Sequence, residues 1–154
     1  MKTNAMRILE SLGISYSIHT YQVDEDHLDA IHAAHTAGLD AERVYKTIVM
    51  RNTEREVYVF CLPAEAEISL KKARALTGSR EIDLIKQNEL LPLTGYIRGG
   101  CSPLGMRKHY PTFIEELAQL EDTIYVSGGQ RGIQIEIAPE DLKRAAGAVF
   151  ADFT

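Results

Sequence analysis

Short strand-like segments are interspersed with short helical segments along this chain, and the two kinds do not alternate strictly. The strand-like segments are rich in β-branched and aromatic residues, or alternate apolar with polar side chains. We expect strands at residues 14–21, 43–51, 56–62, 81–84, 112–116, 122–127, 132–137 and 148–152. We expect helices at residues 4–12, 26–37, 70–76, 86–91 and 139–146. This order favours an α+β domain with a mostly antiparallel or mixed sheet.

Several of the expected helices have residues suited to their ends. Asn4 and Ser69 each precede a helical pattern, and their short polar side chains can accept hydrogen bonds from free backbone amides. Gly78 follows a helical pattern and suits the left-handed conformation that ends a helix. Pro139 suits the first position of the last helix. Residues 94–105 are expected to form a loop with a short strand at its start.

The length of 154 residues and the absence of repeats or linkers indicate one domain, residues 1–154. The net charge of -5 argues against tight non-specific binding of nucleic acid, and we expect no DNA partner. A nucleic-acid substrate still fits this charge if the basic residues gather on one face. Two basic clusters are candidates for such a face, the alternative being solvated surface charge: Lys71, Lys72, Arg74 and Arg80, and Arg98, Arg107, Lys108 and His109.

The cellular setting is constrained by what the sequence lacks. No apolar run approaches the roughly 20 residues of a membrane span, so we expect no membrane partner. The first ten residues have no apolar core or cleavage site typical of a secretion signal. Cys61 and Cys101 have no disulfide or metal spacing, and the five histidines form no clear ligand set. We expect a reduced, cytoplasmic protein without a metal or other cofactor.

Lys46 interrupts a strand-like run that is otherwise mostly apolar, residues 44–49. If both faces of this strand are packed, the ammonium must reach a pocket or an anion, because burying an unpaired charge is costly. Lys46 is therefore a candidate for holding a phosphate or polarising an ester. The alternative is a lysine on the solvent face whose methylene stem lies along the sheet.

A glycine-rich segment at residues 94–105 is the second candidate site. Consecutive glycines at Gly99 and Gly100 let the backbone approach a ligand, and exposed amides there could bind an oxyanion or a phosphate. The segment lacks the Gly-Lys-Ser/Thr ending of a P-loop and the Gly-x-Ser-x-Gly of a nucleophile elbow. The alternative is a long turn without a ligand.

The third candidate site is the tip of an expected hairpin, formed by Ser127, Gly128 and Gly129. The hydroxyl and the two amides could reach a ligand, although a hairpin turn alone explains the same residues. Cys101 is a candidate nucleophile with His109 as its base, because a catalytic cysteine needs a proton acceptor. Cys61 lies in an apolar strand and is expected in the core.

These segments, in this order, resemble the YbaK/ProX family of tRNA-editing domains over nearly the whole chain. The resemblance rests on Val44-Tyr45-Lys46-Thr47, Leu70-Lys71-Lys72, Thr94-Gly95-Tyr96, Gly99-Gly100-Cys101-Ser102-Pro103-Leu104-Gly105 and Ile124-Tyr125-Val126-Ser127-Gly128-Gly129. It implies a single domain with a mixed, curved sheet surrounded by helices, similar to the free-standing YbaK proteins. Two departures concern the pocket: residues 27–30 lack the aromatic-glycine pair of many relatives, and Cys101 replaces an apolar residue.

The resemblance also implies an activity, the hydrolysis of misacylated tRNA in trans. Relatives of the YbaK type remove cysteine that prolyl-tRNA synthetase has attached to its tRNA, and prolyl-tRNA synthetase is then a candidate partner beside the aminoacyl-tRNA. By this likeness the catalytic residues are Lys46, Gly99 and Gly100. The substrate-binding residues are Tyr21, Thr47, Cys101, Ser102, Pro103, Ser127, Gly128 and Gly129.

In this reading the thiol of the substrate attacks its own ester, so the enzyme supplies positioning and oxyanion stabilisation. Three alternatives stay open at this point. The chain could remove another small amino acid such as alanine, bind tRNA or a synthetase without turnover, or act as a hydrolase through Cys101.

Overall fold

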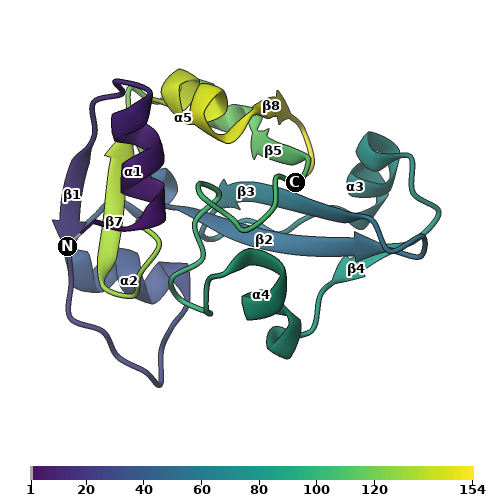
Figure 1. Ribbon diagram of the computed structural model, residues 1–154, viewed down its shortest axis with the longest axis horizontal. Helices are drawn as coiled ribbons and strands as arrows, with labels where there is room; N and C mark the ends of the chain where they lie inside the picture. Colours follow the sequence, from purple (N-terminus) through teal and green to yellow (C-terminus); the bar gives the residue numbers. More distant parts are fainter. Residues whose placement is uncertain (1) are drawn as a thin grey trace.

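The computed structural model describes residues 2–154 (Figure 1). The first half contains α1 (Asn4–Ser11), β1 (Ser17–Thr20), α2 (Ala30–Ala37), the 3-10 helix η1 (Ala41–Arg43), β2 (Tyr45–Asn52), β3 (Val57–Pro63) and α3 (Leu70–Thr77). The second half contains β4 (Ile82–Leu84), α4 (Gln87–Thr94), β5 (Thr112–Glu115), the 3-10 helix η2 (Glu116–Leu120), β6 (Ile124–Ser127), β7 (Ile133–Ile137), α5 (Pro139–Ala146) and β8 (Ala148–Ala151).

The strands form two hydrogen-bonded groups. The smaller sheet has the order β1-β7-β6 and is antiparallel. The larger sheet has the order β4-β2-β3-β5-β8, with antiparallel pairs around β2 and parallel pairs around β5. An isolated parallel bridge between Val44 and Tyr125 joins the two groups. The predicted α+β fold with a mixed sheet is confirmed.

Helices cover both faces of the smaller sheet (Figure 1). Ile135 and Ile137 of β7 pack with α1 and α5 in the largest core cluster. Because side chains alternate along a strand, Gln134 and Glu136 lie on the opposite face of β7. That face looks toward α2, where Ala34 packs on Tyr125 of β6. The alternation therefore directs two polar side chains to this face of the sheet.

The first helix begins at a different cap from the one expected. Thr3, and not Asn4, is the N-cap, and its hydroxyl accepts a hydrogen bond from the amide of Met6 at 3.2 Å. Asn4 is the first helical residue and accepts a hydrogen bond from the side chain of Arg7 at 3.2 Å. Both residue types can cap a helix, so the sequence did not decide between neighbours.

Helix α4 runs three residues further than expected, to Thr94, and residues 95–100 form turns in place of the short strand predicted at the start of the 94–105 segment. It passes through Pro92 and ends at Gly95, which has a φ of 84°. Pro92 lies in the last turn, where its missing amide costs one hydrogen bond. The Thr94 hydroxyl donates to the Leu90 carbonyl oxygen at 2.7 Å, so the helix closes despite the proline.

Two expected elements, at residues 14–21 and 26–37, are each four residues shorter in the structure. The second helix begins at Ala30 because Asp29 caps it, accepting from the His32 amide at 2.8 Å. The first strand is limited to Ser17–Thr20, the residues that pair with β7. Within residues 2–154, none of the helices has the length and apolar character needed to cross a membrane.

Candidate functional site

A cavity opens where the two strand groups meet. Strand β3 pairs with one edge of β2 over Tyr45 to Arg51, whereas β4 pairs with the other edge only from Met50 to Asn52. Between β4 and the Val44–Tyr125 bridge, no strand of the described chain borders this edge of β2. A cavity of about 420 Å³ lies at this seam. Its volume is in the range of small-molecule sites.

The structure brings together six of the residues expected at the site. They come from four separate parts of the chain and line this one cavity: Tyr21, Lys46, Thr47, Gly99, Cys101 and Ser127. The cavity has a buried floor and an exposed rim. Tyr45 and Gln134 on the floor are 3% and 5% exposed, whereas Leu84 at the rim is 60% exposed. Arg98 and Asp29, also exposed, add one charge of each sign to the lining.

Lys46 is half-buried on β2 and lines the cavity. Within residues 2–154 its ammonium forms no hydrogen bond or ion pair. Burial lowers its pKa, and the more distant Glu67 carboxylate opposes this effect only in part. An unpaired, partly desolvated cation at a cavity is well suited to bind an anion, since a bound anion would relieve the cost of desolvation.

The glycine-rich loop is held against the β6–β7 hairpin by close backbone contact. A Cβ added at Gly100 would lie 3.0 Å from the Arg131 amide nitrogen and 3.1 Å from the Gln130 carbonyl carbon. Gly99 has a φ of 86°, in the left-handed region that favours glycine. The Gly100 amide donates to Ile97 at 3.0 Å and is not free for a ligand. The Gly99 and Cys101 amides donate to no acceptor in the described chain.

Cys101 lines the cavity as a protonated thiol. Burial raises its pKa to about 12, and a hydrogen bond with Thr94 opposes this shift only in part. Its expected base, His109, is directed elsewhere: its ring lies 3.2 Å from the Ala146 carbonyl oxygen, at a different cavity. No histidine lines the cavity that contains Cys101. The geometry therefore gives no support to a Cys101–His109 pair.

Thr47 and the second cysteine lie next to each other across β2 and β3. The Thr47 hydroxyl is 3.9 Å from the Cys61 sulfur, and Cys61 is fully buried. The expectation that Cys61 belongs to the core is confirmed. Its thiol is also protonated, because burial raises its pKa to about 12. Thr47 is thus the lining residue that separates the cavity from this buried thiol.

Five expected site residues do not line the cavity. Gly100 packs on the hairpin, and Ser102 is fully buried with its hydroxyl accepting from the Leu104 amide at 3.2 Å. Pro103 borders the cavity that contains His109. The Gly128 carbonyl oxygen accepts from the Thr3 hydroxyl at 2.6 Å, and Gly129 packs against Tyr96. These residues hold the loop, the hairpin and α1 together.

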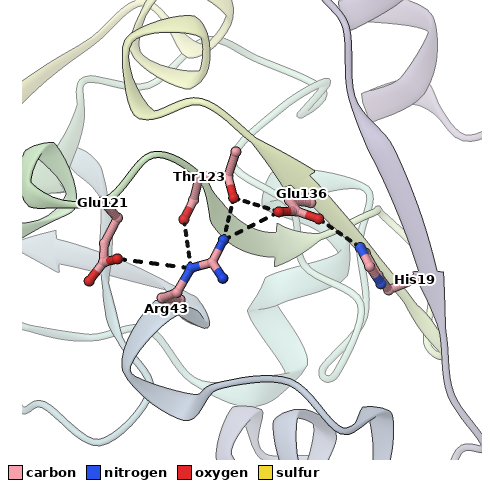
Figure 2. A network of polar contacts seen from close by, with 5 residues as sticks. All are labelled: His19, Arg43, Glu121, Thr123 and Glu136. Carbon is pink, nitrogen blue, oxygen red and sulfur yellow. Dashed lines mark hydrogen bonds and ion pairs between the residues drawn. The ribbon is translucent and has the colours of Figure 1, made fainter.

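A polar network fixes the smaller sheet against the start of β2 (Figure 2). Arg43 of η1 donates to the Thr123 carbonyl oxygen at 3.0 Å and contacts the Glu136 carboxylate at 3.3 Å. On the other side of Glu136, the His19 ring lies 2.9 Å away. Hydrogen bonds from Thr123 and His19 lower the pKa of Glu136. Since Arg43 lies just before β2, the network sets where Lys46 stands relative to β7.

The sequence prediction missed Gln134, a buried polar residue at the floor of the cavity. In an alternating strand such a glutamine is normally assigned to the solvent face, and only the position of α2 shows that this face is covered.

Within residues 2–154, no group of three or more His, Cys, Asp or Glu side chains is placed to hold a metal ion.

Comparison with known protein families assigns the chain to one of them. The model of the aminoacyl-tRNA editing domain family matches residues 24–145, and the chain belongs to this family. The match includes every residue that lines the cavity except Tyr21. The chain is thus an aminoacyl-tRNA deacylase, an enzyme that cleaves the ester between an amino acid and its tRNA.

Individual relatives agree with this assignment. The proposed Cys-tRNA(Pro)/Cys-tRNA(Cys) deacylase EbsC of Enterococcus faecalis is 39% identical over 153 residues, covering 99% of this chain and 93% of EbsC. Two solved structures share the fold at identities near one fifth. The hypothetical protein APE2540 has a TM-score of 0.88 at 22% identity, covering 98% of this chain and 99% of the other. A proposed trans-editing enzyme for prolyl-tRNA synthetase has a TM-score of 0.81 at 21% identity, covering 100% of this chain and 98% of the other.

Proposed function

We propose that this enzyme removes cysteine from misacylated tRNA(Pro), acting in trans after release from the synthetase. The observation that carries the proposal is the unpaired Lys46 ammonium at a cavity bordered by Gly99. The cavity volume suits an aminoacylated terminal nucleoside and is too small for a tRNA stem. The relationship to EbsC supports cysteine as the amino acid and proline tRNA as its carrier.

Each lining residue has a role in this proposal. Lys46 binds the phosphate of the terminal nucleotide. Arg98 lies at the rim, where the rest of the tRNA acceptor end would extend out of the cavity. The unpaired amides of Gly99 and Cys101 stabilise the oxyanion that forms on the ester carbonyl. Tyr21, Thr47 and Ser127 surround the aminoacyl group.

The substrate supplies its own nucleophile. Its thiol sulfur bonds to the ester carbonyl carbon, the bond from that carbon to the ribose 3′ oxygen breaks, and the thiol proton ends on the released 3′ hydroxyl. The product, a cysteine thiolactone, then hydrolyses in water. Holding a thiol beside its own carbonyl gives a high effective molarity, so no enzyme nucleophile is needed. The protonated state of Cys101 agrees with this role for the substrate.

The test compares tRNA(Pro) charged with cysteine, serine or alanine. We expect rapid deacylation of the cysteinyl form and at least about a hundredfold slower loss of serine, because serine is nearly isosteric but lacks the thiol. Trapping of the thiolactone by mass spectrometry identifies the route. Equal rates for cysteine and serine contradict a substrate thiol, and faster loss of alanine would make alanine the substrate.

The Cys101 alternative has its own test. Cys101→Ala is expected to retain deacylation within about threefold, because only its backbone amide is used. Complete loss of activity in a variant that still folds would instead identify a cysteine hydrolase.

A supporting role for prolyl-tRNA synthetase is part of the same proposal. The net charge of -5 gives the enzyme little general affinity for RNA, so a synthetase that presents its misacylated product would raise the local substrate concentration. Such an encounter takes place in the cytoplasm, where tRNA is charged. A faster deacylation rate when prolyl-tRNA synthetase is added supports this association, and an unchanged rate contradicts it.

A further inference from the structure

Gln134 has an unsatisfied hydrogen-bonding group at the floor of the cavity. The side chain is 5% exposed, and its Oε1 is the one buried side-chain nitrogen or oxygen in residues 2–154 that has no hydrogen-bond partner. Gln134 lines the same cavity as Lys46, Gly99 and Ser127. Leaving a buried acceptor unpaired costs stability, so a native protein that retains one needs a reason.

Neither cross-strand neighbour of Gln134 forms a hydrogen bond with its oxygen. Its cross-strand neighbours are His19 and Ser127, and His19 is already engaged by Glu136. The Ser127 hydroxyl accepts from the Gly129 amide at 3.3 Å, and its own O–H does not donate to the Gln134 Oε1. A glutamine amide turns readily about its last torsion, so a donor entering the cavity can meet the oxygen.

We propose that the side-chain carbonyl of Gln134 accepts a hydrogen bond from the α-amino group of the bound aminoacyl ester. This inference rests on the proposed function and names a specificity-determining residue for it. The position of the charges orients the substrate. Lys46 and Arg98 attract the phosphate side, so the acyl group extends toward the floor. Among the acyl group's donors, the amino group is strong and a thiol is weak.

The role of this contact is to fix the acyl group about its Cα. When Gln134 holds the amino group, rotation about the Cα of the amino acid is restricted. The side chain then has one orientation, which keeps the thiol near the carbonyl carbon. Gln134 does not touch the reacting atoms and is a positioning residue. A neutral amide oxygen accepts from the amino group whether or not that group is protonated, so the contact forms in both ionisation states and is stronger when the amino group is charged.

The experiment is an enzyme–substrate cycle with Gln134→Met, which keeps length and volume but removes both polar groups. The two substrates are cysteinyl-tRNA(Pro) and 3-mercaptopropionyl-tRNA(Pro). The second keeps the ester and the thiol that attacks it, and lacks only the α-amino group. We expect about a tenfold loss of kcat/KM on the cysteinyl substrate, as for a hydrogen bond to a charged donor, and less than a twofold change on the other. A loss equal on both substrates overturns the inference.

Two further variants separate recognition from structure. Gln134→Glu keeps an acceptor and is expected to restore the preference for the substrate that carries the amino group. Gln119→Met introduces the same side chain at an exposed position of η2 away from the cavity, and is expected to change neither rate. If Gln134→Glu loses the preference as Gln134→Met does, the inference fails. If the wild-type enzyme cleaves neither ester, the proposed function fails first, so the two failures are distinguishable.

Discussion

Lys46 is a charged side chain that the folded protein stabilises poorly. Its ammonium is half-buried without a partner in the described chain, and burial lowers its pKa. In the interval between the lowered pKa and the usual lysine value near 10.4, the unfolded chain binds more protons than the folded one. The free energy of unfolding therefore rises with pH across that interval. Below the interval, the burial of the charged ammonium destabilises the folded state by its full amount.

We expect Lys46→Met to lower kcat/KM about a hundredfold or more and to raise the Tm at pH 7. Activity falls because an anion-binding group is lost, whereas stability rises because an unpaired charge is removed. The gain in Tm over wild type should shrink as the pH approaches 10, measured by thermal unfolding at several pH values. Lys46→Arg serves as the matched control, since it keeps the charge and should show no gain. A Tm for Lys46→Met below that of wild type at pH 7 contradicts this account.

At the scale of elements, the glycine-rich loop depends on contact with the β6–β7 hairpin. We expect Gly100→Ala to lower both the Tm and kcat/KM, the latter about tenfold, because the new Cβ would press on the backbone of Gln130 and Arg131. The loop must then move, and the Gly99 amide moves with it. Deacylation kinetics at a temperature well below the Tm measure the effect on the site.

A matched variant distinguishes this from lost stability alone. Gly78 ends α3 with a φ of 64° and has no atom within 4 Å of an added Cβ. Gly78→Ala should cost roughly 1–2 kcal/mol through the left-handed backbone alone and leave kcat/KM unchanged. Comparable losses of activity in both variants would refute a specific role for the loop contact.

The sequence predicted those elements whose signals are local. The β6–β7 hairpin follows from its alternation, and α3 from Ser69 and Gly78 at its two ends. The end of α4 could not be placed, because Pro92 resembles a stop and the Thr94 hydroxyl bond that closes the helix is not visible in a pattern. Gln134 was missed for a different reason, since a covering helix from another part of the chain decides its burial.

The segments that form the candidate site were predictable, but which of their residues line the cavity and which serve packing was not. Lys46, Gly99 and Ser127 stand out in sequence as a lysine in an apolar strand, a glycine pair and a hairpin tip, and the fold brings all three to one cavity. Ser102 and Gly128 belong to the same motifs but serve packing. Which members of a motif meet the cavity depends on backbone direction, which the motif alone does not specify.

For the molecule as a whole, the negative net charge limits its general affinity for RNA. Three basic side chains lie at or near the cavity, Lys46, Arg98 and Arg131. We expect log(kcat/KM) to fall with log[KCl] with a slope no steeper than about −2, as for up to three phosphate contacts. We also expect an acceptor-stem minihelix to be cleaved within about threefold of full-length tRNA. A much steeper slope, or a minihelix that is hardly cleaved, would indicate a wider RNA-binding surface.

The seam between the two sheets has a consequence for how preference changes during evolution. Lys46, to which we assign the phosphate, stands on the larger sheet, whereas Ser127 and Gln134 stand on the smaller one, and within residues 2–154 a single backbone bridge joins the two sheets. Under the proposed function, substitutions at Ser127 or Gln134 are expected to change which amino acid is accepted without removing the Lys46 contact with the nucleotide.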